Sequence, residues 1–430
     1  MIIFSFFAMI LVGTLLLMLP ISSRSRTWTP FSDAIFTAVS ASCVTGLVVQ
    51  DTATYWSLFG QTVLLLLIQI GGLGVVTMAL AITIASGKRI GIRARSFLQD
   101  AVSAPTVGGI VKLTGFILKI TFSTELIGAA VLATAFIPEF GFIKGLWYSL
   151  FHSVSAFCNA GFDLMGINGK FSSLTAFQDH PVVVITVSFL VIFGGIGFLV
   201  WRDFRDHRLR LKKYRMQSKI VLVMSSLLLV VPAILFFFLE FTEGTFLHRI
   251  SLSWFQSMTA RTAGFNTADL PSMSEAGLFL MIGLMLIGGS PGSTAGGMKT
   301  TTFAVLLSNM RSVFRRRDDV VFFLRRIDKE SIRNASTIAT MYILLFSAGG
   351  CLISLIEGLP LLTCLYEAAS AVGTVGVTLG ITPNVGHISR AILIILMYLG
   401  RVGGLTIIFA AVSADKKRLS KYPLEKLTVG

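Results

Sequence analysis

Charged residues are scarce in this sequence. Only 13% of the 430 residues are charged and 54% are hydrophobic, whereas about 25% of the residues in a soluble domain are charged. The apolar residues gather in runs near the ~20 residues that a helix needs to cross a bilayer. Examples are residues 4–20, 60–85, 182–201 and 220–239. The composition therefore excludes an ordinary soluble domain and indicates an integral membrane protein. The first run lacks the basic start and the cleavage site of a secretion signal, so we expect a retained spanning helix.

Cysteine is also rare, and the common catalytic groupings are missing. None of the four cysteines belongs to a CxxC pair, so the sequence indicates neither a metal cluster nor a disulfide framework. We interpret them as small buried thiols. The five histidines are scattered, and we find no Ser/His/Asp grouping and no paired carboxylates at membrane depth. We therefore do not expect an enzyme.

Acidic residues are outnumbered, with 21 Asp and Glu against 36 Lys and Arg, and the net charge is +15. Of the basic residues, 27 fall in four blocks beside apolar runs, at residues 88–119, 202–219, 311–333 and 416–426. The positive-inside rule places all four blocks in the cytoplasm. Because membrane topology explains the blocks, we expect no nucleic-acid partner. The sequence predicts a multi-pass membrane protein.

One glycine turn recurs four times between the apolar runs. Its glycines are separated by 115, 103 and 112 residues. Each turn follows an amphipathic stretch of 11 to 13 residues, which as a helix reaches only ~20 Å and is too short to span. Irregular backbone at membrane depth is tolerated only inside protein or against water. The four turns are Val44-Thr45-Gly46, Asn159-Ala160-Gly161, Thr262-Ala263-Gly264 and Thr374-Val375-Gly376.

These features predict an all-α membrane fold. Four repeats of helix, re-entrant half helix and second helix would surround a central pore, giving eight spanning helices and four half helices. The expected half helices cover residues 31–43, 146–158, 249–260 and 362–372. The expected repeats are residues 1–95, 96–215, 216–330 and 331–430, the last with the C-terminal tail.

Four glycine turns around one axis suit a cation. Glycine adopts the dihedrals that aim backbone carbonyls at a common centre without steric cost. The C-terminal ends of the half helices add partial negative charge. Arg261, just before Gly264, would repel a cation, so we expect it to lie behind the turn and hold a half helix; a tethered charge that tunes occupancy is the alternative.

The second helices carry glycine pairs, at residues 71–72, 194–195, 288–289 and 403–404, which favour close packing. In the third repeat this helix is interrupted, because five glycines and a proline in ten residues break an α-helix. A phosphate loop and a kinked packing helix are the weaker alternatives. The interrupted stretch comprises Gly288, Gly289, Ser290, Pro291, Gly292, Ser293, Thr294, Ala295, Gly296 and Gly297.

Together the four turns, the eight expected spans and the interrupted helix resemble the ion-translocating subunit of the Ktr/Trk/HKT superfamily of potassium transporters, and more closely its Ktr branch. The resemblance covers nearly the whole chain. It implies that the turn residues form a potassium filter, and that Gly46 at the first position, where serine favours sodium, selects potassium. It also implies sodium-stimulated uptake.

The resemblance further implies that residues 288–297 form an intramembrane gate. Arg401 is its expected companion, because a charge inside a spanning helix is a functional candidate and a guanidinium donates up to five hydrogen bonds. We expect Arg401 to hold the loop closed below the filter. Lys299 could help Arg401 to hold the loop, although a position at the cytoplasmic surface is the favoured expectation.

Partners follow from the resemblance as well. It implies a homodimer with residues 416–430 near its interface. It also implies a cytosolic RCK-type regulatory subunit, like KtrA or KtrC, that binds ATP or ADP. Residues 202–219 and 311–333 are candidate contacts for that subunit, although they would also serve to fix topology alone.

The alternative class is a sodium-coupled secondary carrier for another small solute. Such a carrier combines broken helices with inverted repeats and carboxylates at mid-membrane. Here the expected repeats are four and parallel, and Glu125 and Glu367 lie near helix ends or half-helix starts.

Overall fold

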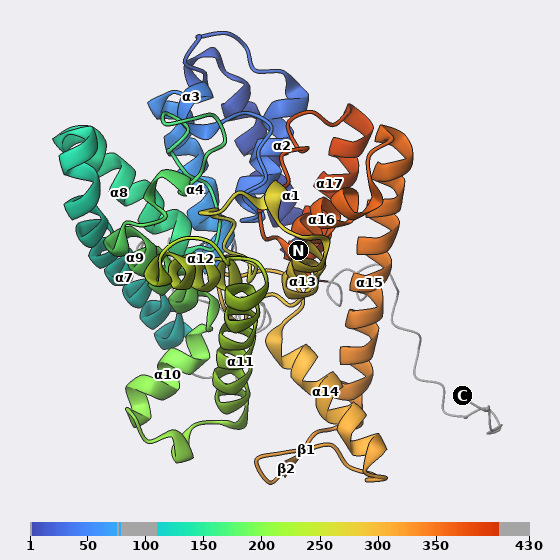
Figure 1. Ribbon diagram of the computed structural model, residues 1–430. Coiled ribbons are helices and arrows are strands. Elements are labelled where there is room, and N and C mark those ends of the chain that lie inside the picture. The colour runs from blue at the N-terminus through green and yellow to red at the C-terminus, as the bar shows by residue number, and fades with distance from the viewer. Residues whose placement is uncertain (1, 75–76, 79–109, 404–430) are drawn as a thin grey trace.

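The computed structural model describes residues 2–74, 77–78 and 110–403 (Figure 1). These residues are predominantly helical, as the sequence predicts. The N-terminal half contains α1 (Ile2–Met18), α2 (Phe31–Ser42), α3 (Thr52–Tyr55), α4 (Leu58–Leu73), α7 (Ile110–Phe140), α8 (Phe142–Phe157), α9 (Pro181–Gly195) and α10 (Phe198–His207). The C-terminal half contains α11 (Met216–Leu239), α12 (Phe246–Thr259), α13 (Glu275–Leu286), α14 (Thr300–Phe314), α15 (Lys329–Glu357), α16 (Leu361–Gly373) and α17 (His387–Val402). An antiparallel hairpin joins α14 to α15 through β1 (Val321–Phe322) and β2 (Arg325–Arg326).

Three of the described helices, α7, α11 and α15, are long and apolar enough to cross a bilayer by length and composition. The pair α9 and α10 makes a fourth span if its two arms are counted together. Helices α1, α4 and α13 are apolar but shorter. The multi-pass character therefore agrees with the sequence, while the expected total of eight spans stays a prediction.

Short helices lie at the four positions where the sequence predicts half helices, namely α2, α8, α12 and α16; that they are re-entrant stays a prediction. They contain 12, 16, 14 and 13 residues, which at 1.5 Å per residue gives about 18–24 Å. Proline at the N-cap starts α2 and α16 with extended backbone, and Thr245 caps α12 through its side chain. The C-terminal turn of each is buried, because each ends inside the protein rather than at its surface.

The expectation that only the third of the second helices is interrupted is wrong. Residues 182–201 do not form one helix, because α9 and α10 meet at 92° across a short break. Gly197, with φ +97°, lies in this break as the N-cap of α10, in a conformation that other residues rarely adopt. Helices α4 and α17 also end at left-handed glycines, Gly74 and Gly403. Their expected extensions to residues 85 and 412 lie outside the described residues.

Helix contacts run in a closed cycle around the molecule. Helix α4 packs on α8, α9 on α12, α13 on α16, and α17 back on α2. Glycines permit close packing of α4 on α2, α9 on α8 and α17 on α16. A β-carbon on Gly71, Gly194 or Gly400 would collide with a carbonyl oxygen in the last turn of α2, α8 or α16, respectively. The expected packing role of the glycine pairs in α4 and α9 is thus confirmed, and the same glycine-rich segments also end the helices.

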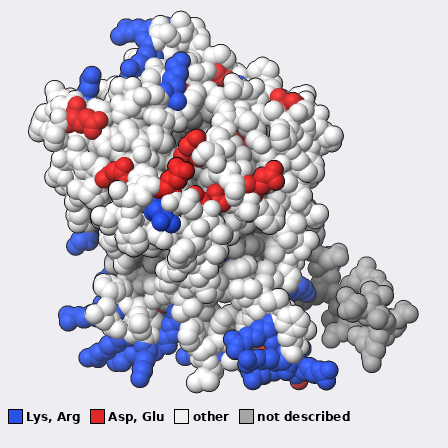
Figure 2. Space-filling model, viewed as in Figure 1, with Lys and Arg blue, Asp and Glu red and all other residues white. Residues whose placement is uncertain are grey.

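Charge is distributed unevenly over the surface. Figure 2 shows most of the visible Lys and Arg gathered at the end of the molecule where α10, α14 and the hairpin lie, with a smaller group at the opposite end and Asp and Glu mainly across that half. We call the end with α10, α14 and the hairpin the basic end. By the positive-inside rule we expect it to face the cytoplasm.

Candidate functional site

The four glycine turns meet one another. A β-carbon built on Gly46 would lie 3.1 Å from the Cα of Gly161, and one built on Gly161 would lie 2.7 Å from the Cα of Gly264. A β-carbon built on Gly264 would lie 3.4 Å from the Cα of Gly376, and one built on Gly376 would lie 3.0 Å from the Cα of Gly46. The glycines therefore form a closed ring in which each faces the next. Turns more than 100 residues apart in sequence are neighbours in space.

Carbonyl oxygens line this ring. Beside each glycine lies the carbonyl oxygen of the residue just before the neighbouring glycine: Ala160 beside Gly46, Ala263 beside Gly161, Val375 beside Gly264 and Thr45 beside Gly376. Any side chain larger than hydrogen would press on these oxygens. The arrangement offers main-chain oxygen ligands that carry no full negative charge.

All four turns adopt the same unusual backbone. The glycines have φ of +93°, +70°, +80° and +100° in chain order, and the residue two positions earlier is also left-handed in each turn. Those residues are Val44, Asn159, Thr262 and Thr374, with φ of 50°, 56°, 65° and 50°. Left-handed backbone costs a non-glycine residue about 1–2 kcal/mol. Its occurrence at four matching positions points to a functional constraint on the backbone path.

Hydroxyl groups in the half helices brace the turns, and the sequence analysis missed them. The Ser40 and Ser370 hydroxyls accept hydrogen bonds from the N–H groups of Gly46 and Gly376, at 3.1 and 3.0 Å. The corresponding hydroxyls in α8 and α12, Ser155 and Thr259, instead donate to the carbonyls of Phe162 and Phe265, just after the glycine. The signal was available, since a serine or threonine stands five or six residues before every ring glycine.

Several polar atoms next to the ring are buried without a hydrogen-bond partner among the described residues. They are Thr45 Oγ1, Asn159 Nδ2, Thr262 Oγ1 and Thr374 Oγ1. Buried polar atoms are normally paired with protein or water. Four unpaired atoms beside one ring of carbonyls suit a path occupied by water and ions.

An outer cavity of about 530 Å³ opens over the ring, and all four glycines line it. Three carboxylates, Asp51, Asp163 and Asp269, also line it and give it negative charge. Burial raises the pKa of Asp163 to about 6, with nearby Asp51 adding to the rise and the Met165 N–H opposing it. The cavity is thus suited to attract a cation before it meets the ring.

Arg261 is only 9% exposed, and its Nη1 donates to the carbonyl of Ser225 in α11 at 3.3 Å. The bond ties the third turn, at the end of α12, to α11. A bracing contact is thus present, while the position of the charge behind the turn stays a prediction.

Residues 288–297 form an irregular loop that packs beneath the ring. The Ser290 and Thr294 N–H groups donate to the carbonyls of Gly195 and Gly194, at 3.0 and 3.2 Å, so the break between α9 and α10 anchors the loop. The Thr294 hydroxyl donates to the carbonyl of Phe157 at 2.9 Å and lies 3.0 Å from Asn159 Oδ1. The loop therefore touches a turn residue directly.

Arg401 of α17 joins this loop to the end of α4. Its Nη1 donates to the Thr294 carbonyl at 2.6 Å, and Nη2 donates to the carbonyls of Gly71 and, at 3.1 Å, Gly72 at the end of α4. The predicted contact between Arg401 and the loop is present. For Lys299 the less favoured of the two expectations holds, because its ammonium donates to the loop carbonyls of Ala295 and Gly296 at 2.8 and 3.4 Å.

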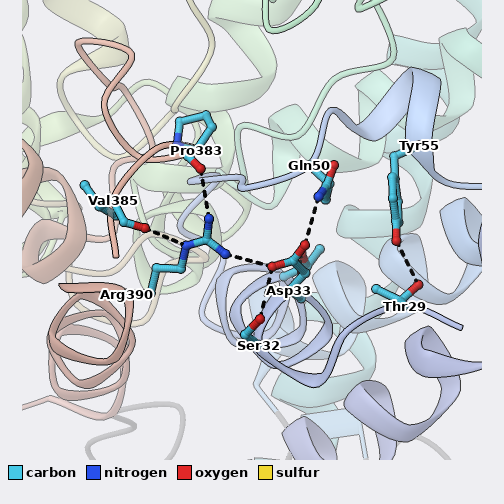
Figure 3. Close-up of polar contacts among 9 residues, drawn as sticks. Thr29, Ser32, Asp33, Gln50, Tyr55, Pro383, Val385 and Arg390 are labelled. Atoms are coloured by element: carbon cyan, nitrogen blue, oxygen red, sulfur yellow. Dashed lines mark hydrogen bonds and ion pairs between the residues drawn. The ribbon is translucent and has the colours of Figure 1, made fainter. Parts of the chain in front are cut away.

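A buried ion pair that the sequence did not predict closes the cycle between its first and last elements (Figure 3). Arg390 of α17 donates to Asp33 of α2 at 2.8 Å, and the two side chains are only 17% and 10% exposed. Gln50 donates to the other Asp33 oxygen at 2.8 Å, while Arg390 also donates to the carbonyls of Val385 and Pro383. The pair joins residues 357 positions apart, so no local pattern announces it.

We expect Arg390→Gln to destabilise the protein, because it leaves the buried Asp33 carboxylate without a counter-ion, with only neutral donors such as Gln50 beside it. Removing one partner of a buried pair costs about 3–5 kcal/mol. Thermal unfolding in detergent should show a lower Tm for Arg390→Gln and for Asp33→Asn, and the double variant should recover part of the loss. Strictly additive losses would contradict the coupling.

The fold and the site define a multi-pass membrane protein with a ring of main-chain turns at its centre. The chain belongs to the TrkH family of cation transport proteins, which matches residues 1–422. The potassium/sodium uptake protein NtpJ of Enterococcus hirae is 41% identical, over 99% of this chain and 95% of the relative. The Ktr system potassium uptake protein B of Bacillus subtilis is 39% identical, over 97% of this chain and 93% of the relative. The solved structure of the potassium transporter TrkH from Vibrio parahaemolyticus matches with a TM-score of 0.71 at 20% identity, over 95% of this chain and 84% of that chain, and so shares the fold.

Proposed function

We propose that this protein takes up potassium across a bacterial cytoplasmic membrane, and that the four turns act as its selectivity filter. The observation that carries the proposal is the closed ring of Gly46, Gly161, Gly264 and Gly376 with a carbonyl oxygen beside each glycine. Carbonyl oxygens replace the hydration shell of a cation without trapping it, as an ionised carboxylate would. The names of the relatives, which are potassium uptake proteins, support the choice of ion.

In this proposal the filter residues are those of the four turns. The cation loses its water gradually, first among the carboxylates of the outer cavity and then among main-chain oxygens. The ends of α2, α8, α12 and α16 stabilise the ion, because each C-terminus carries about half a negative charge. Hydroxyl braces such as Ser40 keep the turns from collapsing when the ion leaves.

We also propose that residues 288–297 and Arg401 gate the path. The loop packs against Asn159 and, through Gly296, against the Thr374 side chain, so it lies next to the unpaired polar atoms of the ring. Arg401 holds it to α4, and it adds positive charge near the cation path. Opening would then require the loop to leave Arg401.

The wider organisation is proposed on the same basis. The four repeats would be residues 1–95, 96–215, 216–330 and 331–430, and the protein would be a homodimer. Uptake would be stimulated by sodium, because the E. hirae relative is named a potassium/sodium uptake protein. A cytosolic RCK-type subunit that binds ATP or ADP would control the gate, since the name of the B. subtilis relative places it in a Ktr system.

Selectivity tests the proposal. We expect Gly46→Ser to lower the preference for potassium over sodium by about tenfold or more, equivalent to ~1.4 kcal/mol. A serine there must adopt φ +93°, and its β-carbon would press on the Ala160 carbonyl 2.6 Å away. Uptake of rubidium or potassium into a transport-deficient host, with and without sodium, measures the change.

Gly380→Ser is the matched control for this experiment. Gly380 also has positive φ, +88°, but a β-carbon there meets nothing within 4 Å. It should keep the parent's selectivity. If Gly46→Ser transports both ions in the parent's ratio, or if the parent moves no alkali cation, the filter assignment is wrong.

A further inference from the structure

The basic end carries a second cavity, of about 410 Å³, between α11, α14 and the hairpin. Three arginines line it, namely Arg311, Arg315 and Arg317. Met224 of α11 and Phe322 of β1 add apolar lining. This cavity is separate from the ring and its outer cavity, with which it shares no lining residue.

The chain folds back on itself to bring the arginines together. Helix α14 ends at Phe314, and Arg316 then adopts a left-handed φ of 51°. The Arg317 N–H donates to the Ser312 carbonyl at 3.0 Å, and the Ser312 hydroxyl donates to the carbonyls of Arg317 and Asp319 at 3.0 and 2.9 Å. Arg317 is therefore held beside the last turn of α14.

The positive charge of the cavity is not neutralised from within. In the part of the chain that the structure describes, none of the three arginines forms an ion pair. Among the described lining residues Asp319 is acidic, but its carboxylate pairs with Arg326 at 3.2 Å. Three arginines that converge on a cavity of this size are suited to an anionic headgroup.

An apolar stripe runs along α14 beside the cavity. Leu307, Met310 and Phe314 follow helical spacing and are 40%, 50% and 78% exposed. Exposure of these apolar side chains to water would be unfavourable, whereas they suit the boundary between lipid headgroups and acyl chains. Helix α14 packs against α11 and α15, both of spanning length, and the arginines lie at its far end, near where these spans meet the basic end.

We propose that this cavity binds the phosphate of an anionic glycerophospholipid from the cytoplasmic leaflet, with the acyl chains along the stripe on α14. Basic pockets between membrane helices on the cytoplasmic side are suited to such headgroups. The stripe favours a lipid over an acidic protein surface, because it needs hydrocarbon as well as negative charge. The site goes beyond ion translocation and gives residues 311–317 a ligand.

The test is a lipid titration of the full-length protein in neutral detergent, followed by native mass spectrometry. The probes are phosphatidylglycerol, phosphatidylcholine, glycerol 3-phosphate and inorganic phosphate. We expect selective retention of phosphatidylglycerol. Replacing Arg311, Arg315 and Arg317 by glutamine should weaken its binding roughly 100-fold, since each arginine near an anionic lipid contributes about fivefold.

Two variants control for charge and folding. Glutamine at Arg210, Lys212 and Lys213 removes the same charge from an exposed segment of the basic end and should change binding less than about twofold. Lysine at the three cavity positions keeps the charge and should stay within about tenfold of the parent. Because Arg317 is an exposed loop residue, Arg317→Gln alone provides a milder loss of about fivefold.

Four results would overturn the proposal. Equal retention of phosphatidylcholine would remove the role of the headgroup charge. Competition by glycerol 3-phosphate or inorganic phosphate at the lipid's own concentration would indicate a site for a free anion. Equal losses in the cavity and control glutamine variants would indicate only general surface attraction. If the cavity glutamine variant kept its lipid binding but no longer bound a cytosolic protein partner, the cavity would be a protein contact instead.

Discussion

Gly376→Ala is expected to reduce potassium flux on the order of 100-fold, which corresponds to ~2.7 kcal/mol in the barrier. Gly376 has φ +100°, a conformation that strains any other residue. A β-carbon there would collide with the carbonyl oxygen of Thr45 and lie 3.0 Å from the Cα of Gly46. Both neighbours are backbone atoms of the ring, so neither moves without displacing a carbonyl oxygen of the proposed filter.

The backbone strain and the crowding of the ring can be separated by a control. Gly380→Ala imposes a similar φ, +88°, in a place where its β-carbon meets nothing within 4 Å. Rubidium uptake into proteoliposomes should therefore be nearly normal for Gly380→Ala and almost lost for Gly376→Ala. Equal activity of the two variants would show that the glycine ring does not line the ion path.

Arg401→Ala is expected to raise basal flux at least about tenfold in the absence of any regulatory subunit. The guanidinium donates to three carbonyls, one in the loop and two at the end of α4. Hydrogen bonds from a charged group are worth about 1.5–3 kcal/mol each, and a shift of 1.4 kcal/mol already changes a two-state population tenfold. Without Arg401 the loop keeps its bonds to Gly194 and Gly195 but loses its tie to α4.

Deleting residues 290–297 should have the same effect, since it removes the obstruction itself. Arg401→Lys is the matched variant, because an ammonium keeps the charge but lacks the planar fork that binds two elements together. We expect intermediate flux for it. The measurement is potassium-selective flux from purified vesicles. If both the alanine variant and the deletion variant show the same flux as the parent, the gate assignment is wrong.

Much of the site could be predicted because its chemistry depends on local sequence. A glycine that must adopt positive φ is visible as a glycine, and a short amphipathic stretch before it is visible as a half helix. The bracing contact of Arg261 was expected from electrostatics alone, since a cation path disfavours a guanidinium. The hydroxyls at Ser40 and Ser370 were equally visible in the sequence, but their role appears only once the turn is folded.

Other features depended on contacts between distant segments. The break between α9 and α10 was misjudged, because two glycines within an apolar run are compatible with either a packed helix or a bend. Its bend brings the carbonyls of Gly194 and Gly195 to the loop at residues 288–297. For Lys299 the less favoured expectation holds, because which loop carbonyls lie within reach of its ammonium depends on the path of the folded loop.

By itself, the sequence determined the membrane setting, the helical class, the half helices and the four turns, because composition and glycine act locally on burial and backbone conformation. Only the tertiary structure decided which atoms meet. These contacts are the closed ring of glycines, the Asp33–Arg390 ion pair and the hydrogen bonds from Arg401 to both the loop and α4. Such contacts join segments up to several hundred residues apart, and their energies depend on distance in space, which no local pattern of residues encodes.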